Sequence, residues 1–165
     1  DIADAKISGE LLDPTKPKRH VVGVDIDIRE HNRIAIEAHP LSDRIHMIEG
    51  SSIDSKIVDE VKQFIKPESR VMVCLDSMHT HEHVLSELKA YAPLVTEGCY
   101  CIVFDTFVED MPNDLFPDRP WSPGDNPKTA VHKFLENDKQ YSIDKSIQDK
   151  LLITVAPDGF LQKIK

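Results

Sequence analysis

The sequence predicts an α/β fold in which a parallel β-α series ends in an antiparallel hairpin. Short β-branched or apolar runs alternate with amphipathic segments along most of the chain, as expected where crossover helices join parallel strands. The turn signal Pro157-Asp158-Gly159 then separates strand-like runs near the C-terminus. No repeat, low-complexity tract or clean linker divides the 165 residues, so we expect one domain.

The first part of the series has two predicted strands and two predicted helices. In chain order these are a strand over 20–27, a helix over 29–41, a strand over 44–50 and a helix over 51–67. The strands are short and bounded by acids or turn residues. The first helix stops at Pro40 and the second at Pro67, because proline cannot continue a helix. Ser51 and Ser52 supply capping groups for the second helix.

The second part repeats this alternation of strands and helices and then continues into a long loop, a helix and the closing strands. Its elements are a strand over 70–76, a helix over 83–95, a strand over 98–105, a loop over 106–127, a helix over 128–138 and two or three strands within 141–165. The run 70–76 is nearly all apolar, as in a central strand covered on both faces. The Pro-, Asp- and Asn-rich loop 106–127 is predicted to be a functional loop or lid, in which Trp121 either covers a substrate or anchors the loop.

The amino-acid composition indicates which classes of partner the protein is suited to bind. The net charge of -9 and the pI near 5.3 argue against non-specific electrostatic binding of nucleic acid. No apolar run approaches the length of a membrane span. The three cysteines, Cys74, Cys99 and Cys101, lie in apolar strand-like runs, which indicates buried thiols in a reducing cytoplasm. A small-molecule substrate or a protein partner is therefore favoured, and homo-oligomer formation is left open.

Acidic side chains stand at the carboxyl ends of predicted strands, where open α/β sheets bind ligands. Asp25 is suited to accept hydrogen bonds from ribose hydroxyls, and the alternative is that Asp25 or Asp27 caps the next helix. Ser51 and Ser52 are suited to contact an adenine ring, and the alternative is again a helix cap.

Asp76 and Asp105 end two apolar strands that should lie side by side. Their carboxylates would then share one hard cation, which offsets the repulsion between two neighbouring negative charges. The alternative is helix capping, with Asp76 at the N-terminus of the helix over 83–95.

Three histidines follow Asp76 in the stretch CLDSMHTHEHV. His79 and His83 are spaced to share a helical face, as in a zinc hydrolase, while His81 would point elsewhere. However, Thr80 occupies the position where a zinc protease carries its glutamate. We therefore expect no zinc site here, and expect at least one of the histidines to be solvated surface.

Several long motifs together resemble the cephalosporin hydroxylase family. They are VVGVDIDIREHNR, MIEGSSID, VCLDSMHTHEHVLSELKAYAPLV, CIVFDTFVEDMP, RPWSPGDNPKTAV and KLLITVAPDGFL, which cover nearly the whole chain. Despite its name, this family resembles S-adenosylmethionine-dependent O-methyltransferases and is similar to sugar methyltransferases acting on rhamnosyl groups. The resemblance implies a Rossmann-like methyltransferase sheet. It also implies methyl transfer from S-adenosylmethionine to a hydroxyl of a sugar or secondary metabolite, with or without help from Mg2+.

The resemblance also implies roles for particular residues. It places the cofactor ribose on Asp25, the adenine near Ser51 and Ser52, and a magnesium ion on Asp76 and Asp105. Asp76 belongs to the cofactor side of the site as well as to the metal and catalytic sets.

The set of metal ligands departs from that wider pattern. A further oxygen ligand flanks the second aspartate in related enzymes, but here Phe104 and Thr106 flank Asp105. His79, next to the predicted ion, is a candidate base for the hydroxyl proton, with a supporting or capping role as the alternative. These departures leave open a non-catalytic nucleotide-binding protein of the same fold. The histidine cluster leaves open a metal-dependent hydrolase or hydroxylase.

The resemblance further implies a missing beginning. Methyltransferases of this fold start with a strand and a glycine-rich turn for the methionine part of the cofactor, and neither precedes His20. That strand would lie between the strands ending at Asp25 and Asp76. Because both neighbours would otherwise have unpaired edges, we expect the 1–165 domain to be N-terminally incomplete.

Overall fold

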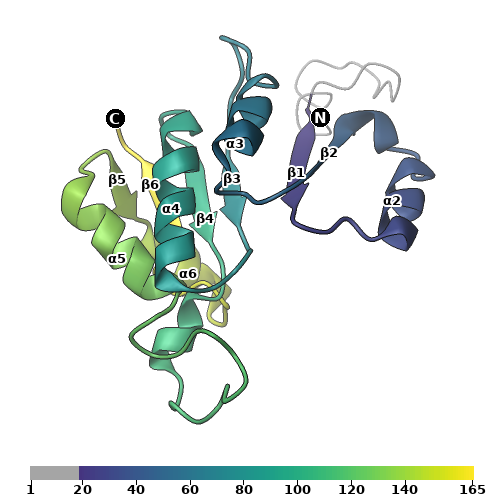
Figure 1. Cartoon of the computed structure of the whole chain (residues 1–165). Helices are drawn as coiled ribbons and strands as arrows, with labels where there is room; N and C mark the ends of the chain where they lie inside the picture. Colours follow the sequence, from purple (N-terminus) through teal and green to yellow (C-terminus); the bar gives the residue numbers. More distant parts are fainter. Residues whose placement is uncertain (1–18) are drawn as a thin grey trace. The chain divides into compact units, whose positions relative to one another are not determined.

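The structure, a computed structural model, describes residues 19–165. The chain falls into two compact units, one that ends at Phe64 and one that runs from Ile65 to Lys165 (Figure 1). The predicted absence of a first strand concerns residues before His20, outside the described range, and it stays a prediction, as does the single domain.

The first unit is built on two parallel strands. Its elements are β1 (Val21–Asp25), α2 (Glu30–Glu37), η1 (Ser42–Arg44), β2 (Ile45–Glu49) and α3 (Ser55–Lys62). β1 and β2 pair in parallel, with Asp25 opposite Glu49 at their carboxyl ends. The amide of Gly50 donates to the Asp25 carbonyl oxygen at 2.8 Å and extends this pairing. Both predicted strands and both predicted helices are present, with shorter bounds.

The second unit contains the larger sheet. Its elements are β3 (Val73–Leu75), α4 (His81–Tyr91), η2 (Ala92–Leu94), β4 (Tyr100–Val103), η3 (Thr106–Asp110), α5 (Pro127–Asn137), β5 (Tyr141–Ile143), α6 (Lys145–Leu151) and β6 (Phe160–Lys163). The strand order is β3-β4-β6-β5. β3 and β4 are parallel, whereas β6 is antiparallel to both β4 and β5. This confirms parallel strands followed by antiparallel ones, but β5 and β6 do not form the predicted hairpin, because α6 lies between them along the chain.

The core of this unit lies between the sheet and two helices. α4 and α5 lie side by side against one face of the sheet (Figure 1). Leu88 on α4, Val131 on α5, and Cys101 and Leu161 on the central strands are fully buried. Burial raises the pKa of the Cys101 thiol to about 12, so this cysteine is an inert core residue as predicted.

The prediction that the strand over 70–76 is covered on both faces is wrong for the described chain. β3 is an edge strand of its sheet, and the side chains of Met72 and Cys74 are exposed. Cys74 is therefore not the buried thiol that the apolar run predicted. An apolar run alone does not distinguish a central strand from an edge strand.

The prediction of only strands and a turn in 141–165 also needs correction. The helix α6 intervenes, with Asp144 as its N-cap accepting from the Ser146 amide at 2.9 Å. The apolar residues Leu152 and Ile153, which resembled a strand, lie in an exposed turn. The capping signal at Asp144 was present in the sequence, but the β-branched run that follows it obscured it.

Candidate functional site

The pairing of β3 with β4 brings the two predicted metal ligands to one edge of the sheet. Leu75 and Val103 are partners at the ends of these strands, and the Phe104 amide donates to the Leu75 carbonyl at 2.9 Å. Asp76 follows β3 directly, and Asp105 lies two residues beyond β4. Asp105 has a left-handed backbone (φ 53), which Asp tolerates better than most residues and which turns the chain into η3.

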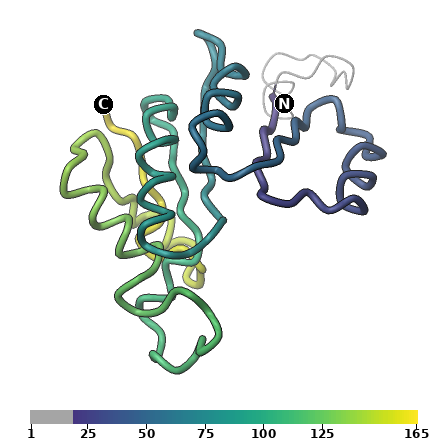
Figure 2. The backbone as a smooth tube through the Cα atoms, viewed as in Figure 1, coloured from purple at the N-terminus to yellow at the C-terminus, as the bar shows by residue number. Residues whose placement is uncertain are grey.

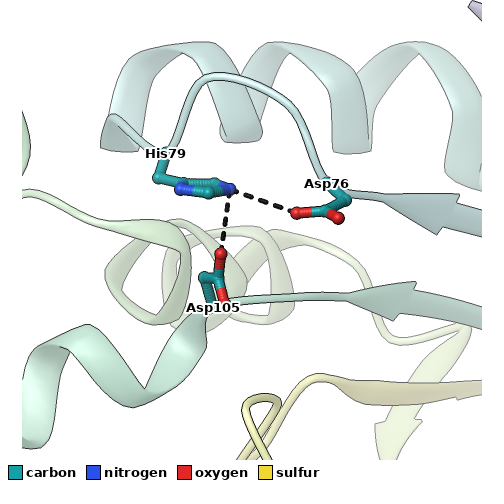
Figure 3. A group of neighbouring side chains, drawn as sticks. All are labelled: Asp76, His79 and Asp105. Atoms are coloured by element: carbon teal, nitrogen blue, oxygen red, sulfur yellow. Dashed lines mark hydrogen bonds and ion pairs between the residues drawn. The ribbon is translucent and has the colours of Figure 1, made fainter. Parts of the chain in front are cut away.

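His79 joins the two carboxylates. Its Nε2 lies 3.3 Å from an Asp76 carboxylate oxygen and 3.3 Å from an Asp105 carboxylate oxygen (Figure 3). The ligand atoms of the three side chains all lie within 4.8 Å of one another. In residues 19–165 this is the one group of three or more His, Cys, Asp or Glu side chains so arranged. The Asp76 side chain is 64% exposed and that of His79 is 17% exposed, so the group is accessible to a ligand.

The turn that carries His79 runs into α4, which begins at His81 and not at residue 83. The His81 amide donates to the Asp125 carboxylate at 2.7 Å, so Asp125 caps the helix where Asp76 was the alternative prediction. The His81 ring Nδ1 lies 2.8 Å from the Thr129 hydroxyl on α5. Contacts from a distant segment thus fix the start of α4.

The histidines do not form a shared face. His79 precedes the helix, whereas the His83 Nε2 lies on α4, 3.5 Å from a Glu87 carboxylate oxygen. The HxxxH zinc arrangement is therefore absent from the described residues. The expectation of a fully solvated histidine is wrong, because His79, His81 and His83 are all partly buried.

Aromatic residues of the long loop stand beside the cluster. The Trp121 ring meets the His79 ring edge-on, with their centroids 5.6 Å apart. Phe116 lies 4.8 Å from Trp121, centroid to centroid. Figure 2 shows this loop projecting at the end of the sheet where β4 finishes. Trp121 thus contacts both the loop and a site residue.

A buried asparagine ties the two ends of this loop together. Asn126 is fully buried, and its side-chain amide donates to the Glu109 carboxylate, which also accepts from the Gly124 amide at 2.7 Å. The Asn126 side-chain oxygen accepts from the amides of Lys128 and Thr129 and caps α5. The sequence alone does not reveal this pairing, because Glu109 is seventeen residues away from Asn126 along the chain.

The predicted ribose ligand lies at the end of β1. The Asp25 side chain is exposed and accepts from the Asp27 amide at 3.0 Å. The N-cap of α2 is Arg29, so neither Asp25 nor Asp27 caps that helix and the capping alternative is wrong. The ribose role of Asp25 stays a prediction.

The predicted adenine contacts, Ser51 and Ser52, lie in the turn after β2 and are partly buried. Asp54 caps α3 through the Lys56 amide at 2.9 Å, so the serines are not the N-cap. Their role toward adenine stays a prediction.

The sequence matches a known protein family. Residues 4–164 match the family described as Rhamnosyl O-methyltransferase/CmcI. The chain belongs to this family. Rhamnosyl O-methyltransferases of Mycobacterium tuberculosis and Mycobacterium bovis are each 32% identical to it over 117 residues. That match covers 69% of this chain and 45% of each relative, so the chain spans about half the length of the curated relatives it matches.

Solved methyltransferase structures share the fold of this family member. MycE methyltransferase from the mycinamycin biosynthetic pathway, in complex with Mg, SAH and mycinamycin VI, superposes with a TM-score of 0.55 and 17% identity. The match covers 88% of this chain and 37% of MycE. A second MycE structure, in complex with Mg and SAH, has a TM-score of 0.51 and 19% identity. The predicted Rossmann-like methyltransferase fold is therefore confirmed at the level of a mixed α/β fold.

Among residues 19–165 no helix has the length and apolar character needed to cross a membrane.

Proposed function

We propose that this family member transfers a methyl group from S-adenosylmethionine to a sugar hydroxyl, with rhamnosyl groups as the first acceptor class to test. Membership of the rhamnosyl O-methyltransferase/CmcI family supports the reaction. The observation that carries the proposal is the group of Asp76, His79 and Asp105, because it stands at the carboxyl ends of parallel strands, where folds of this kind bind ligands.

The donor set fits a divalent cation. Two carboxylates are the ligands that Mg2+ and Mn2+ prefer, and one imidazole nitrogen is compatible with Mn2+. Asp76 and Asp105 are assigned as the residues that would hold it. The hydroxyl of Thr106, the residue after Asp105, is not assigned as a further ligand of the cation. It is buried and donates to the Pro157 carbonyl at 2.6 Å. When bound, the cation would supply Lewis-acid chemistry that makes an acceptor hydroxyl easier to deprotonate.

His79 is proposed as the base. The methyl group of the sulfonium is already activated, so the protein mainly aligns the acceptor oxygen with the methyl carbon and removes the hydroxyl proton. The His79 imidazole would take that proton. One carboxylate oxygen of Asp76 and one of Asp105 each lie 3.3 Å from its Nε2, so these side chains would orient the ring.

Trp121 is proposed to form one wall of the acceptor site. Its ring contacts His79, so a sugar whose hydroxyl reaches the His79 imidazole would have its ring close to the indole. The segment 106–127 would then cover the acceptor, as a lid does.

The cofactor contacts are proposed from the family resemblance. Asp25 would accept hydrogen bonds from the ribose hydroxyls, Ser51 and Ser52 would contact the adenine, and Asp76 would also face the cofactor. The exposed position of Asp25 at the carboxyl end of β1 supports this role.

Two measurements on the full-length protein test the proposal. Isothermal titration with S-adenosylmethionine, with and without Mg2+, should show binding. Labelled methyl groups should then pass from S-adenosylmethionine to simple rhamnosides. Binding without transfer to any sugar would favour the non-catalytic nucleotide-binding alternative, which the residues Phe104 and Thr106 flanking Asp105 also favour. No binding at all would contradict both.

A further inference from the structure

The turn between β3 and α4 rests on a buried carboxylate. Glu87 lies on α4 and is only 2% exposed. Its neighbours on the buried face of the helix, Val84, Leu88 and Tyr91, belong to the core. At this position an apolar residue would continue the stripe, so the glutamate breaks the pattern that packing alone requires.

Glu87 is paired inside the protein. The Ser77 hydroxyl donates to one carboxylate oxygen at 2.7 Å, and the His83 Nε2 lies 3.5 Å from the other. Burial first, and the Glu87 carboxylate second, raise the pKa of Tyr91 to about 12, so the neighbouring phenol stays neutral. A buried carboxylate with polar partners generally stabilises a fold no better than well-packed apolar residues do.

Along the chain, Ser77 lies between Asp76 and His79, the two site residues that the turn carries. The hydrogen bond to Glu87 holds the middle of this turn against α4. The far end of the turn is held by the His81 amide on Asp125. The turn is therefore fixed from two sides, and its orientation sets where the Asp76 and His79 side chains point.

We propose that Glu87 and Ser77 are positioning residues that hold Asp76 and His79 toward Asp105. The proposal rests on the proposed function of that group. Neither residue touches substrate or cation. Glu87 acts through Ser77, and Ser77 acts through the turn, so the pair sets the geometry in which the cation is bound and the acceptor proton is removed.

The test uses full-length Ser77→Ala and Glu87→Leu, with Ser77→Thr as the conservative variant and Glu82→Leu as the matched control. Glu82 lies on the same helix but is exposed. Mn2+ affinity, the rate of methyl transfer at saturating S-adenosylmethionine, and thermal stability are measured for each protein. Ser77→Ala should weaken Mn2+ binding roughly tenfold, as expected for the loss of one hydrogen bond to a charged group.

The variants should separate function from stability. Glu87→Leu removes the acceptor of the Ser77 hydroxyl, so it should weaken Mn2+ binding. Its melting temperature should stay equal or rise, because an apolar side chain replaces a buried charge. Ser77→Thr should recover most of the affinity, and Glu82→Leu should match the wild type. The double variant should be no worse than Ser77→Ala alone, because the two changes break one interaction.

Two results would overturn the inference in different ways. If wild-type protein binds Mn2+ and transfers methyl groups but Ser77→Ala equals it, the positioning role is wrong while the proposed function stands. If affinity falls only in proportion to lost stability, the pair is merely structural. If the wild type neither binds Mn2+ nor transfers methyl groups, the proposed function falls first and the positioning role falls with it.

Discussion

At the scale of single residues, Asp25 is expected to set cofactor affinity. A carboxylate that accepts two ribose hydroxyls contributes on the order of 1 to 3 kcal/mol through charge-assisted hydrogen bonds. Asp25→Ala should therefore raise the dissociation constant for S-adenosylmethionine by roughly five- to 150-fold, measured by isothermal titration on folded, full-length protein. Asp27→Ala is the matched control, because Asp27 is an exposed neighbour. An unchanged constant for Asp25→Ala would remove its assignment to the ribose.

Sequence reasoning identified single residues well where their position along a strand decided their environment. Asp76 and Asp105 were predicted to lie side by side from strand ends alone, and His79 was predicted to stand next to them. It missed Glu87, although an acid within an apolar helical stripe was a readable signal. It could not supply the partners of Asn126 or His81, because those contacts join segments far apart in the chain.

At the scale of elements, Asp158 links two helices to the turn before β6. Its carboxylate is paired with Lys145 on α6 and lies 3.9 Å from Lys128 and 3.7 Å from His132, both on α5. Burial alone would raise the pKa of Asp158, but the hydrogen bond and charge of Lys145, with Lys128 and His132, hold that pKa below its usual value of 3.8.

The sign of the pH effect follows from that shift. Because the folded pKa lies below the unfolded value, the charge of Asp158 stabilises the fold above pH 3.8, and this contribution is lost as pH falls through the folded pKa. Asp158→Asn should lower the free energy of unfolding at pH 7 by about 1 kcal/mol. Asn also tolerates the left-handed backbone found there (φ 66).

Denaturant unfolding of both proteins between pH 7 and pH 2.5 measures this difference. The exposed acid of another ion pair, Glu136 beside Lys133, provides the control, and Glu136→Gln should change stability little. A difference between wild type and Asp158→Asn that persists unchanged at the lowest pH would show that the charge is not its cause.

The second prediction at the scale of elements concerns proteolysis of the loop over 106–127. If it covers the acceptor, proteolytic cleavage within it should slow when cofactor and acceptor are both bound. Its ends are tied by Asn126 and Glu109, so cleavage should concentrate between them, near the exposed Leu115. Limited proteolysis with and without ligands measures the rate. Equal rates would make the segment a structural loop in which Trp121 is only an anchor.

Except for the helix α6, the predicted elements have the right type and order, but their bounds differ. The strands over 70–76 and 98–105 shrink to Val73–Leu75 and Tyr100–Val103, because apolar runs continue past the last ladder hydrogen bonds. α6 was missed because its seven residues lie next to a β-branched run that resembles a strand. Short helices depend on capping and tertiary contacts more than on propensity, so pattern alone detects them poorly.

At the scale of the whole molecule, the α/β class and the family followed from long motifs that span most of the chain, and the match over residues 4–164 confirmed the family. The net charge of -9 favours a small-molecule acceptor and argues against binding of nucleic acid. The apolar run 70–76 alone did not reveal that β3 is an edge strand, because the burial of a strand depends on which strands pair with it in space.

Cation binding to full-length wild type, Asp105→Asn and His81→Ala tests the central claim most directly. Mn2+ titration followed by electron paramagnetic resonance reports binding independently of turnover. The wild type and His81→Ala should bind one ion with similar affinity, because the backbone amide of residue 81 still donates to Asp125 in the variant. Asp105→Asn should lose both ion binding and Mg2+-dependent methyl transfer, because it lacks one of the two carboxylate ligands. Equal binding by Asp105→Asn, or stoichiometric zinc that disappears in His81→Ala, would contradict the account.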